Sequence, residues 1–171
     1  AGSSRRMQGE DKIMALLGGS PVIARSVMQL ELSGAIDEIV IVTREELIAP
    51  IGGLCRDYGF KKVREIVRGG ATRAESVYRG LMHISRAAEL AAIHDGARPL
   101  VTEDIIARTV ELAAKTGAAI PAVPVKDTLK RAQDGVITET PLRDELFAAQ
   151  TPQVFSAELI KAALAKAVED G

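Results

Sequence analysis

Two kinds of segment alternate along the chain, and this alternation constrains the fold more than any other feature of the sequence. Short Val/Ile-rich runs, such as 38–43 and 91–94, are separated by longer stretches with apolar residues at helical spacing. Strand and helix in turn predict an α/β sheet with crossover helices. With 171 residues, 47% of them hydrophobic, the chain has enough apolar material for one domain over 1–171 and too little for two.

The expected elements follow from local start and stop signals. Ser20 is predicted to cap a helix that begins at Pro21 and ends before Gly34, and Thr72 with Glu75 forms a capping box for another helix. A third helix runs from Thr102 to Gly117. The remaining expectations are strands at 37–43, 63–67, 89–94 and 118–125 and helices at 44–58 and 156–170.

One segment is predicted to leave the body of the domain. Asp134-Gly135 lies between two short extended runs, which is the strongest hairpin signal in the chain. We therefore predict a projecting β-hairpin arm within 126–141.

Charge and cysteine content exclude several classes of protein. The 22 basic and 23 acidic residues nearly cancel, so no global field would hold the chain on nucleic acid or an anionic membrane. No apolar run approaches the roughly 20 residues that cross a bilayer. The single Cys55 cannot form an internal disulfide, which favours a reducing cytoplasm.

The first candidate site is Ala1-Gly-Ser-Ser-Arg-Arg-Met7, followed by Lys12. Small residues let backbone N–H groups approach phosphate oxygens, and Arg and Lys neutralise the charge of a triphosphate. An exposed basic tail explains the same residues equally well.

The second candidate is Gly69-Gly-Ala-Thr-Arg-Ala-Glu-Ser76. Paired glycines permit close backbone approach to a flat base, and Ser76 offers a hydroxyl near a helix start, where anions are also attracted. The competing interpretation is an ordinary loop with a helix cap.

The third candidate is His94-Asp-Gly-Ala-Arg-Pro99, at the carboxyl end of a predicted strand, where open α/β sheets usually bind ligands. Asp95 could hold a ribose hydroxyl or a metal ion, and Arg98 could clamp a phosphate. Alternatively, the two side chains only pair with each other. His94 is expected to be a hydrogen-bonded structural residue, and His83 a surface residue.

A fourth polar set flanks the predicted arm: Asp127-Thr128, Lys130, Arg143 and Gln150-Thr-Pro-Gln153. Turn and edge-strand roles are the simpler interpretation of these residues.

Taken in this order, the A-G-x-x-x-R-M start with Lys12, G-G-x-x-R-x-x-S-V, H-D-G-A-R-P, D-T-L-K and Q-T-P-Q-V-F resemble the 2-C-methyl-D-erythritol 4-phosphate cytidylyltransferase family over nearly the whole chain. The resemblance implies a Rossmann-like three-layer α/β/α sandwich with a mostly parallel sheet. It also implies a homodimer whose hairpin arms, here about 126–150, exchange between subunits, and a divalent cation, usually Mg²⁺. The expected reaction joins CTP to the polyol phosphate in isoprenoid precursor synthesis.

The resemblance also assigns roles to residues. Ala1 and Gly2 would line the nucleotide, Gly70 and Ser76 would recognise cytosine, and Asp95 with Gly96 would contact the ribose. Arg6 and Lys12 would be the catalytic pair that grips the triphosphate and stabilises the transition state. Arg98 and Thr151 would bind the acceptor phosphate, with Thr128 and Arg143 reaching over from the partner's arm. It assigns no residue as a metal ligand.

The sequence departs from the family pattern in places. The family's apolar first strand and its C-terminal strands, with an N-x-K-x-T motif, are not found, so we expect a fragment or an incomplete sheet. Ser4 stands where a second glycine is usual, and Ala71 where an acidic residue is common.

Other functions stay open from the sequence. A cytidylyltransferase for ribitol 5-phosphate or another polyol phosphate would share the nucleotide motifs, and a non-catalytic dimeric nucleotide-binding module would share the fold. A dinucleotide-dependent oxidoreductase is disfavoured because no glycine fingerprint follows a predicted strand.

Overall fold

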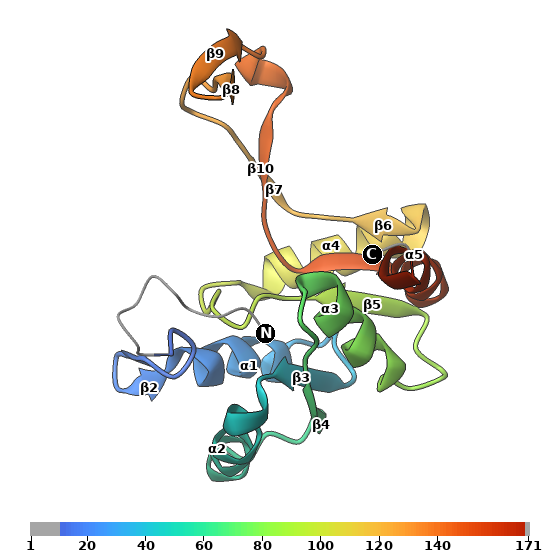
Figure 1. The fold of residues 1–171 in the computed structure, drawn as a ribbon. Coiled ribbons are helices and arrows are strands. Elements are labelled where there is room, and N and C mark those ends of the chain that lie inside the picture. Colours follow the sequence, from blue (N-terminus) through green and yellow to red (C-terminus); the bar gives the residue numbers. More distant parts are fainter. Residues whose placement is uncertain (1–10, 170–171) are drawn as a thin grey trace.

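The computed structural model describes residues 11–169 as an α/β body with a projecting arm (Figure 1). Its helices are α1 (Val22–Leu32), α2 (Glu45–Asp57), α3 (Arg73–Met82), α4 (Glu103–Thr116) and α5 (Ala157–Glu169), with a 3-10 helix η1 (Arg143–Glu145). Its strands are β1 (Leu16–Leu17), β2 (Ser20–Pro21), β3 (Ile39–Thr43), β4 (Val63–Arg68), β5 (Leu90–Ile93), β6 (Ala118–Ala119), β7 (Ala122–Pro124), β8 (Arg131–Gln133), β9 (Val136–Glu139), β10 (Phe147–Ala149) and β11 (Gln153–Ser156).

The first half of the body is a parallel βαβ unit. β3 and β4 pair in parallel, from Ile39 opposite Val63 to Thr43 opposite Arg68, with α2 as the crossover helix between them. The inward residues of β3, including Ile41, are buried with Ile23 of α1 and Ile51 of α2. This part confirms the predicted strand–helix–strand order.

The second half is built differently from the expectation of a mostly parallel sheet. β11 lies between β5 and β6 and is antiparallel to both. β5 and β6 therefore run in the same direction but do not pair with each other. Among the described residues, β3–β4 is the one parallel ladder, and the other ladders are antiparallel. The sequence hides this because the apolar run at 154–155 is continuous with the following helix.

Helices cover this second sheet. Leu81 of α3 and Ala157 at the start of α5 are buried together with Ala91 of β5. Ala113 of α4 is buried with Ala119 of β6 and Val154 of β11. Apolar residues of the helices therefore pack against apolar residues of the strands in small clusters, as in other α/β architectures.

A slot separates the two sheets. Within residues 11–169, β3 pairs only with β4 and β5 pairs only with β11. A cavity of about 730 Å³ lies between them and is lined by Val40 and Val42 of β3, by the whole of β5, and by Val77 and Leu81 of α3. The facing edges of β3 and β5 are thus left without a neighbouring strand.

The arm projects well away from the body (Figure 1). β7 and β10 pair as its stalk, with Ala122 opposite Ala149, and β8 and β9 pair at its tip. Asp134 (φ 50°) and Gly135 (φ 80°) occupy the left-handed region that a tight two-residue hairpin needs. The hairpin prediction is confirmed, although the arm begins at β7 rather than at residue 126.

The single strand expected at 118–125 is two strands. β6 belongs to the body sheet and β7 to the stalk, with Ile120 and Pro121 between them. Pro121 has no N–H to give to a ladder, and its carbonyl instead accepts from the Gln150 N–H at 2.8 Å. The proline therefore marks the point where the chain leaves the body.

Most predicted helix ends are confirmed, but the one at Ser20 is wrong. Thr72 accepts from the Glu75 N–H and Thr102 from the Ile105 N–H, and Gly117 ends α4 in the left-handed conformation. Ser20 instead lies in β2, and Pro21 takes the N-cap position. The backbone of the preceding turn satisfies the first N–H groups of α1, because Val22 and Ile23 donate to the carbonyls of residues 15 and 13.

Over the described residues, no helix combines the length and the apolar character that a membrane crossing requires.

Candidate active site

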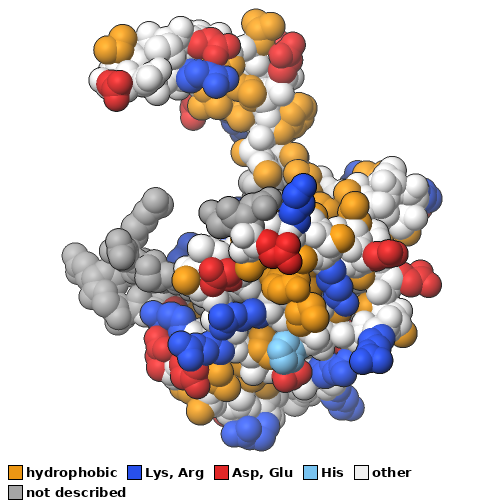
Figure 2. Space-filling view, turned by 45° about the vertical axis from the view of Figure 1, so that its right-hand side comes forward, with side chains coloured by type: hydrophobic (Ala, Val, Ile, Leu, Met, Phe, Trp, Pro, Cys, Tyr) orange, Lys and Arg blue, Asp and Glu red, His pale blue; other side chains and the backbone are white. Residues whose placement is uncertain are grey.

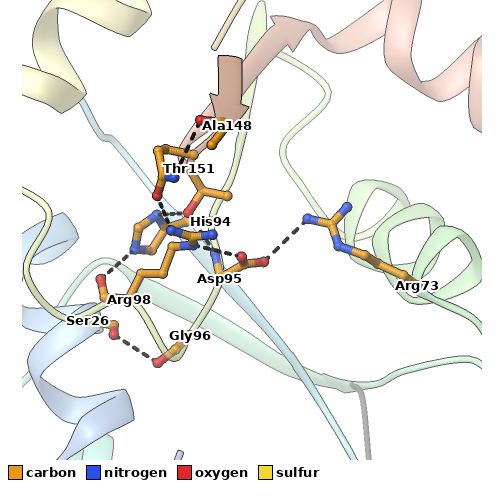
Figure 3. Close-up of polar contacts among 9 residues, drawn as sticks. Ser26, Arg73, His94, Asp95, Gly96, Arg98, Ala148 and Thr151 are labelled. Atoms are coloured by element: carbon orange, nitrogen blue, oxygen red, sulfur yellow. Dashed lines mark hydrogen bonds and ion pairs between the residues drawn. The ribbon is translucent and has the colours of Figure 1, made fainter. Parts of the chain in front are cut away.

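The candidate site forms where β5 and β11 lie side by side. Because Ile93 is opposite Gln153 in their ladder, the segment that follows β5 meets the segment that precedes β11. The two motifs that contain Arg98 and Thr151 therefore come together, as the resemblance implied. We call His94, Asp95, Arg98, Gln150 and Thr151, together with Arg73, the strand-end cluster (Figure 3).

Asp95 is the charged centre of the strand-end cluster. Its two carboxylate oxygens accept from Arg98 Nε at 3.0 Å and from Arg73 Nη2 at 3.3 Å. Burial alone would raise the pKa of Asp95, but the hydrogen bonds from Arg98 and Arg73 and their charges hold it below its ordinary value. Asp95 and Arg98 do pair with each other, and Arg73 from the start of α3 joins them.

Arg98 is held at both ends of its guanidinium group. Nε binds Asp95, and Nη1 donates to the Gln150 side-chain oxygen. The side chain of Arg98 is 40% exposed, so donor groups of the guanidinium stay open to solvent. A preoriented, partly exposed guanidinium is suited to binding a phosphate in a bidentate way.

His94 connects the two halves of the strand-end cluster. Its Nε2 lies 3.1 Å from the Arg98 carbonyl oxygen, and its Nδ1 lies 2.9 Å from the Thr151 hydroxyl oxygen. Burial lowers the pKa of His94, and the hydrogen bond to the Arg98 backbone only partly opposes this. The prediction of a hydrogen-bonded histidine is confirmed, and His83 is exposed on α3's C-terminal side, paired with Glu65.

The turn before α3 is held tightly by its own side chains. The buried Ser76 hydroxyl donates to the Thr72 carbonyl at 2.8 Å and accepts from the Gly70 N–H at 3.1 Å. A Cβ at Gly70 would collide with the side chain of Glu75, whose carboxylate accepts from the Ala71 N–H. Gly70 is thus required by packing, and the hydrogen bonds of the Ser76 hydroxyl hold the turn in place.

Gly96 lies against α1. A Cβ there would come within 2.8 Å of Ile23 Cδ1, and the Gly96 carbonyl accepts from the Ser26 hydroxyl at 2.8 Å. Ser26, which is buried, was not predicted as part of the site, because a serine inside an amphipathic helix carries no signal of its distant partner. It ties the loop after β5 to α1.

Among the other predicted residues that the structure describes, Lys12, Thr128 and Arg143 are not part of the strand-end cluster. Ala1, Gly2 and Arg6 lie outside the described residues, and Lys12 is exposed in the turn before β1. Thr128 and Arg143 are exposed on the arm, where Arg143 donates to the Lys126 carbonyl at 3.3 Å. The arm that carries them projects away from the body (Figure 1).

Comparison with known proteins gives one consistent result. The family model "IspD: 2-C-methyl-D-erythritol 4-phosphate cytidylyltransferase" matches residues 1–171. The 2-C-methyl-D-erythritol 4-phosphate cytidylyltransferase of Halalkalibacterium halodurans is 46% identical over 168 residues, which cover 98% of this chain and 73% of that protein. The enzyme of the same name from Dehalococcoides mccartyi is 43% identical over 164 residues, with 95% and 72% covered.

Solved structures agree with the sequence relatives. The 4-diphosphocytidyl-2C-methyl-D-erythritol synthase of Anaerococcus prevotii matches with a TM-score of 0.83 at 32% identity, covering 90% of this chain and 67% of that one. The 2-C-methyl-D-erythritol 4-phosphate cytidylyltransferase of Thermus thermophilus matches with a TM-score of 0.77 at 30% identity, covering 94% and 72%.

With these matches, the α/β fold and the arginine-rich strand-end cluster define a nucleotidyltransferase. The relatives described above are named as cytidylyltransferases or as 4-diphosphocytidyl-2C-methyl-D-erythritol synthases. The chain belongs to the 2-C-methyl-D-erythritol 4-phosphate cytidylyltransferase family.

Proposed function

We propose that this chain transfers the cytidylyl group of CTP to 2-C-methyl-D-erythritol 4-phosphate, giving 4-diphosphocytidyl-2-C-methyl-D-erythritol and pyrophosphate for isoprenoid synthesis. The observation that carries the proposal is the strand-end cluster, in which Arg98 is preoriented by Asp95 and Gln150 in a chain of this family. A phosphate oxygen of the acceptor attacks the α-phosphorus of CTP, and the bond to the β-phosphate oxygen breaks as pyrophosphate leaves. No covalent enzyme intermediate is needed.

The chain's contribution to this transfer is positioning and charge. Arg98 receives the acceptor phosphate, while Arg6 and Lys12 neutralise the triphosphate as charge builds up in the transition state. The turn at Gly70 presents its backbone to cytosine, alongside Ala1 and Gly2. Since the Ser76 hydroxyl is already bonded to Thr72 and Gly70, Ser76 acts on cytosine by fixing this turn. Asp95 and Gly96 lie on the ribose side.

A homodimer with exchanged arms is part of the proposal. Large apolar side chains lie on the arm, and no residue within 11–169 buries them: Val136 is 67%, Leu142 71% and Phe147 59% exposed. Figure 2 shows hydrophobic side chains on the arm, which stands off the body. Apolar surface of this kind marks a protein interface, and a partner's arm would bring Thr128 and Arg143 to the acceptor next to Arg98 and Thr151.

Mg²⁺ fits this site as a complex with the nucleotide. Over the described residues, no group of three or more His, Cys, Asp or Glu side chains could hold a metal ion. Mg²⁺ commonly takes one or two carboxylates and completes its shell with substrate phosphates and water, and Asp95 is the carboxylate of the cluster. When bound, the ion would neutralise charge on the phosphates.

The finer fold assignment also belongs to this proposal. A Rossmann-like sandwich needs one continuous sheet, and the slot between β3 and β5 has unpaired edges and apolar walls on both sides. One further apolar strand in the slot would join the two sheets, as the family's first strand does by resemblance. A reducing cytoplasm is the expected location, since the single Cys55 is a buried free thiol.

Pyrophosphate release tests the proposal. The protein is given CTP and Mg²⁺ with either 2-C-methyl-D-erythritol 4-phosphate or ribitol 5-phosphate, and pyrophosphate is measured with time. We expect release with the methylerythritol phosphate and little with ribitol phosphate. Release with ribitol 5-phosphate alone would mean that ribitol 5-phosphate is the acceptor. Binding of CTP without pyrophosphate release from either acceptor would favour a nucleotide-binding module.

A further inference from the structure

His94 bonds to two separate segments of the candidate site. Its two ring nitrogens bond to two residues from separate segments, the carbonyl of Arg98 at 3.1 Å and the hydroxyl of Thr151 at 2.9 Å (Figure 3). These are the two residues that the proposed function assigns to the acceptor phosphate. The imidazole therefore lies between the parts of one binding subsite.

The hydrogen-bond partners determine the tautomer of His94. A carbonyl oxygen can only accept, so Nε2 must carry the proton that bonds to Arg98. In a neutral imidazole Nδ1 then has a lone pair, and the Thr151 hydroxyl donates to it. Burial lowers the pKa of His94 and so favours this neutral form.

This tautomer fixes the hydroxyl of Thr151. Its proton points to His94 Nδ1, and its oxygen accepts from the Asp95 N–H at 3.3 Å. Thr151 is 7% exposed, so its hydroxyl has few alternative partners in water. The orientation of Thr151 and the backbone position of Arg98 are thus set by one ring.

We infer that His94 is a positioning residue for the acceptor phosphate, which holds the Arg98 backbone and the segment at Thr151 at a fixed separation. Because the Thr151 hydroxyl donates its proton to His94, the Arg98 guanidinium is the donor that meets the phosphate. This inference rests on the proposed function for the identity of the acceptor. It assigns His94 a larger effect on the acceptor than on CTP, because His94 bonds to both residues proposed for the acceptor phosphate, whereas CTP is proposed to meet the turn at Gly70 and the N-terminal cations as well as Asp95 and Gly96.

Three substitutions separate the two bonds. His94→Ala removes both. His94→Asn keeps an acceptor oxygen near the position of Nδ1 and thus the bond to Thr151, whereas His94→Gln can reach the position of Nε2 and donate to the Arg98 carbonyl. His83→Ala is the matched control, because His83 is the other histidine of the chain and pairs with Glu65 on the surface.

Steady-state kinetics with both substrates varied gives the test. We expect His94→Ala to raise the KM for methylerythritol phosphate about tenfold, with the KM for CTP within about twofold of wild type. Asn and Gln should each recover part of the loss, and His83→Ala should match wild type. Equal rises in both KM values, or wild-type kinetics in His94→Ala, would overturn the inference. If His94→Ala fails to fold, the Asn and Gln variants decide by the same comparison.

A readout without turnover separates this inference from the proposed function. Inorganic phosphate is titrated into the wild type and into His94→Gln, and the Thr151 amide is followed by NMR. A phosphate-dependent shift in the wild type that weakens in the variant supports positioning even if no pyrophosphate is released. An equal shift in both proteins, or none in either, contradicts it.

Discussion

At the scale of single residues, the site depends on close contacts that tolerate little change. Gly70 and Gly96 each have a neighbour where a Cβ would be, the Glu75 side chain and Ile23 respectively. Asp95 holds two arginines, one of them the proposed phosphate ligand. The sequence pointed to Gly70 and Asp95, because paired glycines and a strand-end carboxylate are local signals, whereas Gly96 came from the family resemblance alone. It did not predict Ser26, whose bond to Gly96 spans distant parts of the chain.

Gly70→Ala should lower both stability and CTP affinity. The added Cβ would have to displace Glu75 and with it the turn, at a cost of about 1–3 kcal/mol. Gly34→Ala is the control, because nothing lies within 4 Å of a Cβ at that position. Chemical denaturation and calorimetric CTP titration measure the two effects. Equal behaviour of both variants would show that the turn at Gly70 is not tightly packed.

Asp95→Asn should weaken acceptor binding by about tenfold, since Arg98 loses a charged anchor. Asp104→Asn removes a comparable carboxylate, but one whose pairing with Arg108 lies on the exposed surface of α4 and contributes at most about 0.5 kcal/mol. The KM for methylerythritol phosphate of each variant decides the matter. An unchanged KM in Asp95→Asn would mean that Gln150 alone orients Arg98.

At the scale of elements, helix ends were more predictable than strand partners. Thr72, Thr102 and Gly117 act on backbone groups within four residues, so their motifs suffice to predict them. Ser20 failed as a cap because the turn at 13–15 supplies the acceptors for α1, a contact that no capping motif contains. The insertion of β11 between β5 and β6 depends on pairing across the whole domain, which periodicity cannot reveal.

The two threonine caps should have different consequences. Thr72→Ala and Thr102→Ala each remove a side-chain acceptor at a helix start and should each cost about 1 kcal/mol of unfolding free energy. Only Thr72 adjoins the turn that includes Gly70, so only Thr72→Ala should also weaken CTP binding. Denaturation and CTP titration are measured on both. An equal loss of CTP affinity in Thr102→Ala would show that Thr72 has no particular role in CTP binding.

At the scale of the whole molecule, the two parts of the proposed active site lie on different parts of one chain. The strand-end cluster lies on the body, whereas Thr128 and Arg143 lie on the projecting arm (Figure 1). The sequence predicted the hairpin from Asp134-Gly135, but no local signal indicates whether the arm contacts its own subunit or a partner subunit. Apolar exposure along the arm supports contact with a second copy.

Mixing two inactive variants should restore activity if the arms exchange. Arg98→Ala disables the body half of a site and Arg143→Ala the arm half. Heterodimers of the two then contain one site with both residues intact. Random assortment would give about a quarter of wild-type turnover. No recovery after subunit exchange, verified by native mass spectrometry, would show that each site uses its own arm or none.

The central claim is that the α-phosphorus of CTP moves to the acceptor. The most direct measurement uses CTP labelled at the α-phosphorus, incubated with the protein, Mg²⁺ and 2-C-methyl-D-erythritol 4-phosphate, with separation of the products. The proposal predicts label in 4-diphosphocytidyl-2-C-methyl-D-erythritol and none in pyrophosphate. Label recovered only as unchanged CTP, or as CMP without an acceptor adduct, would contradict it.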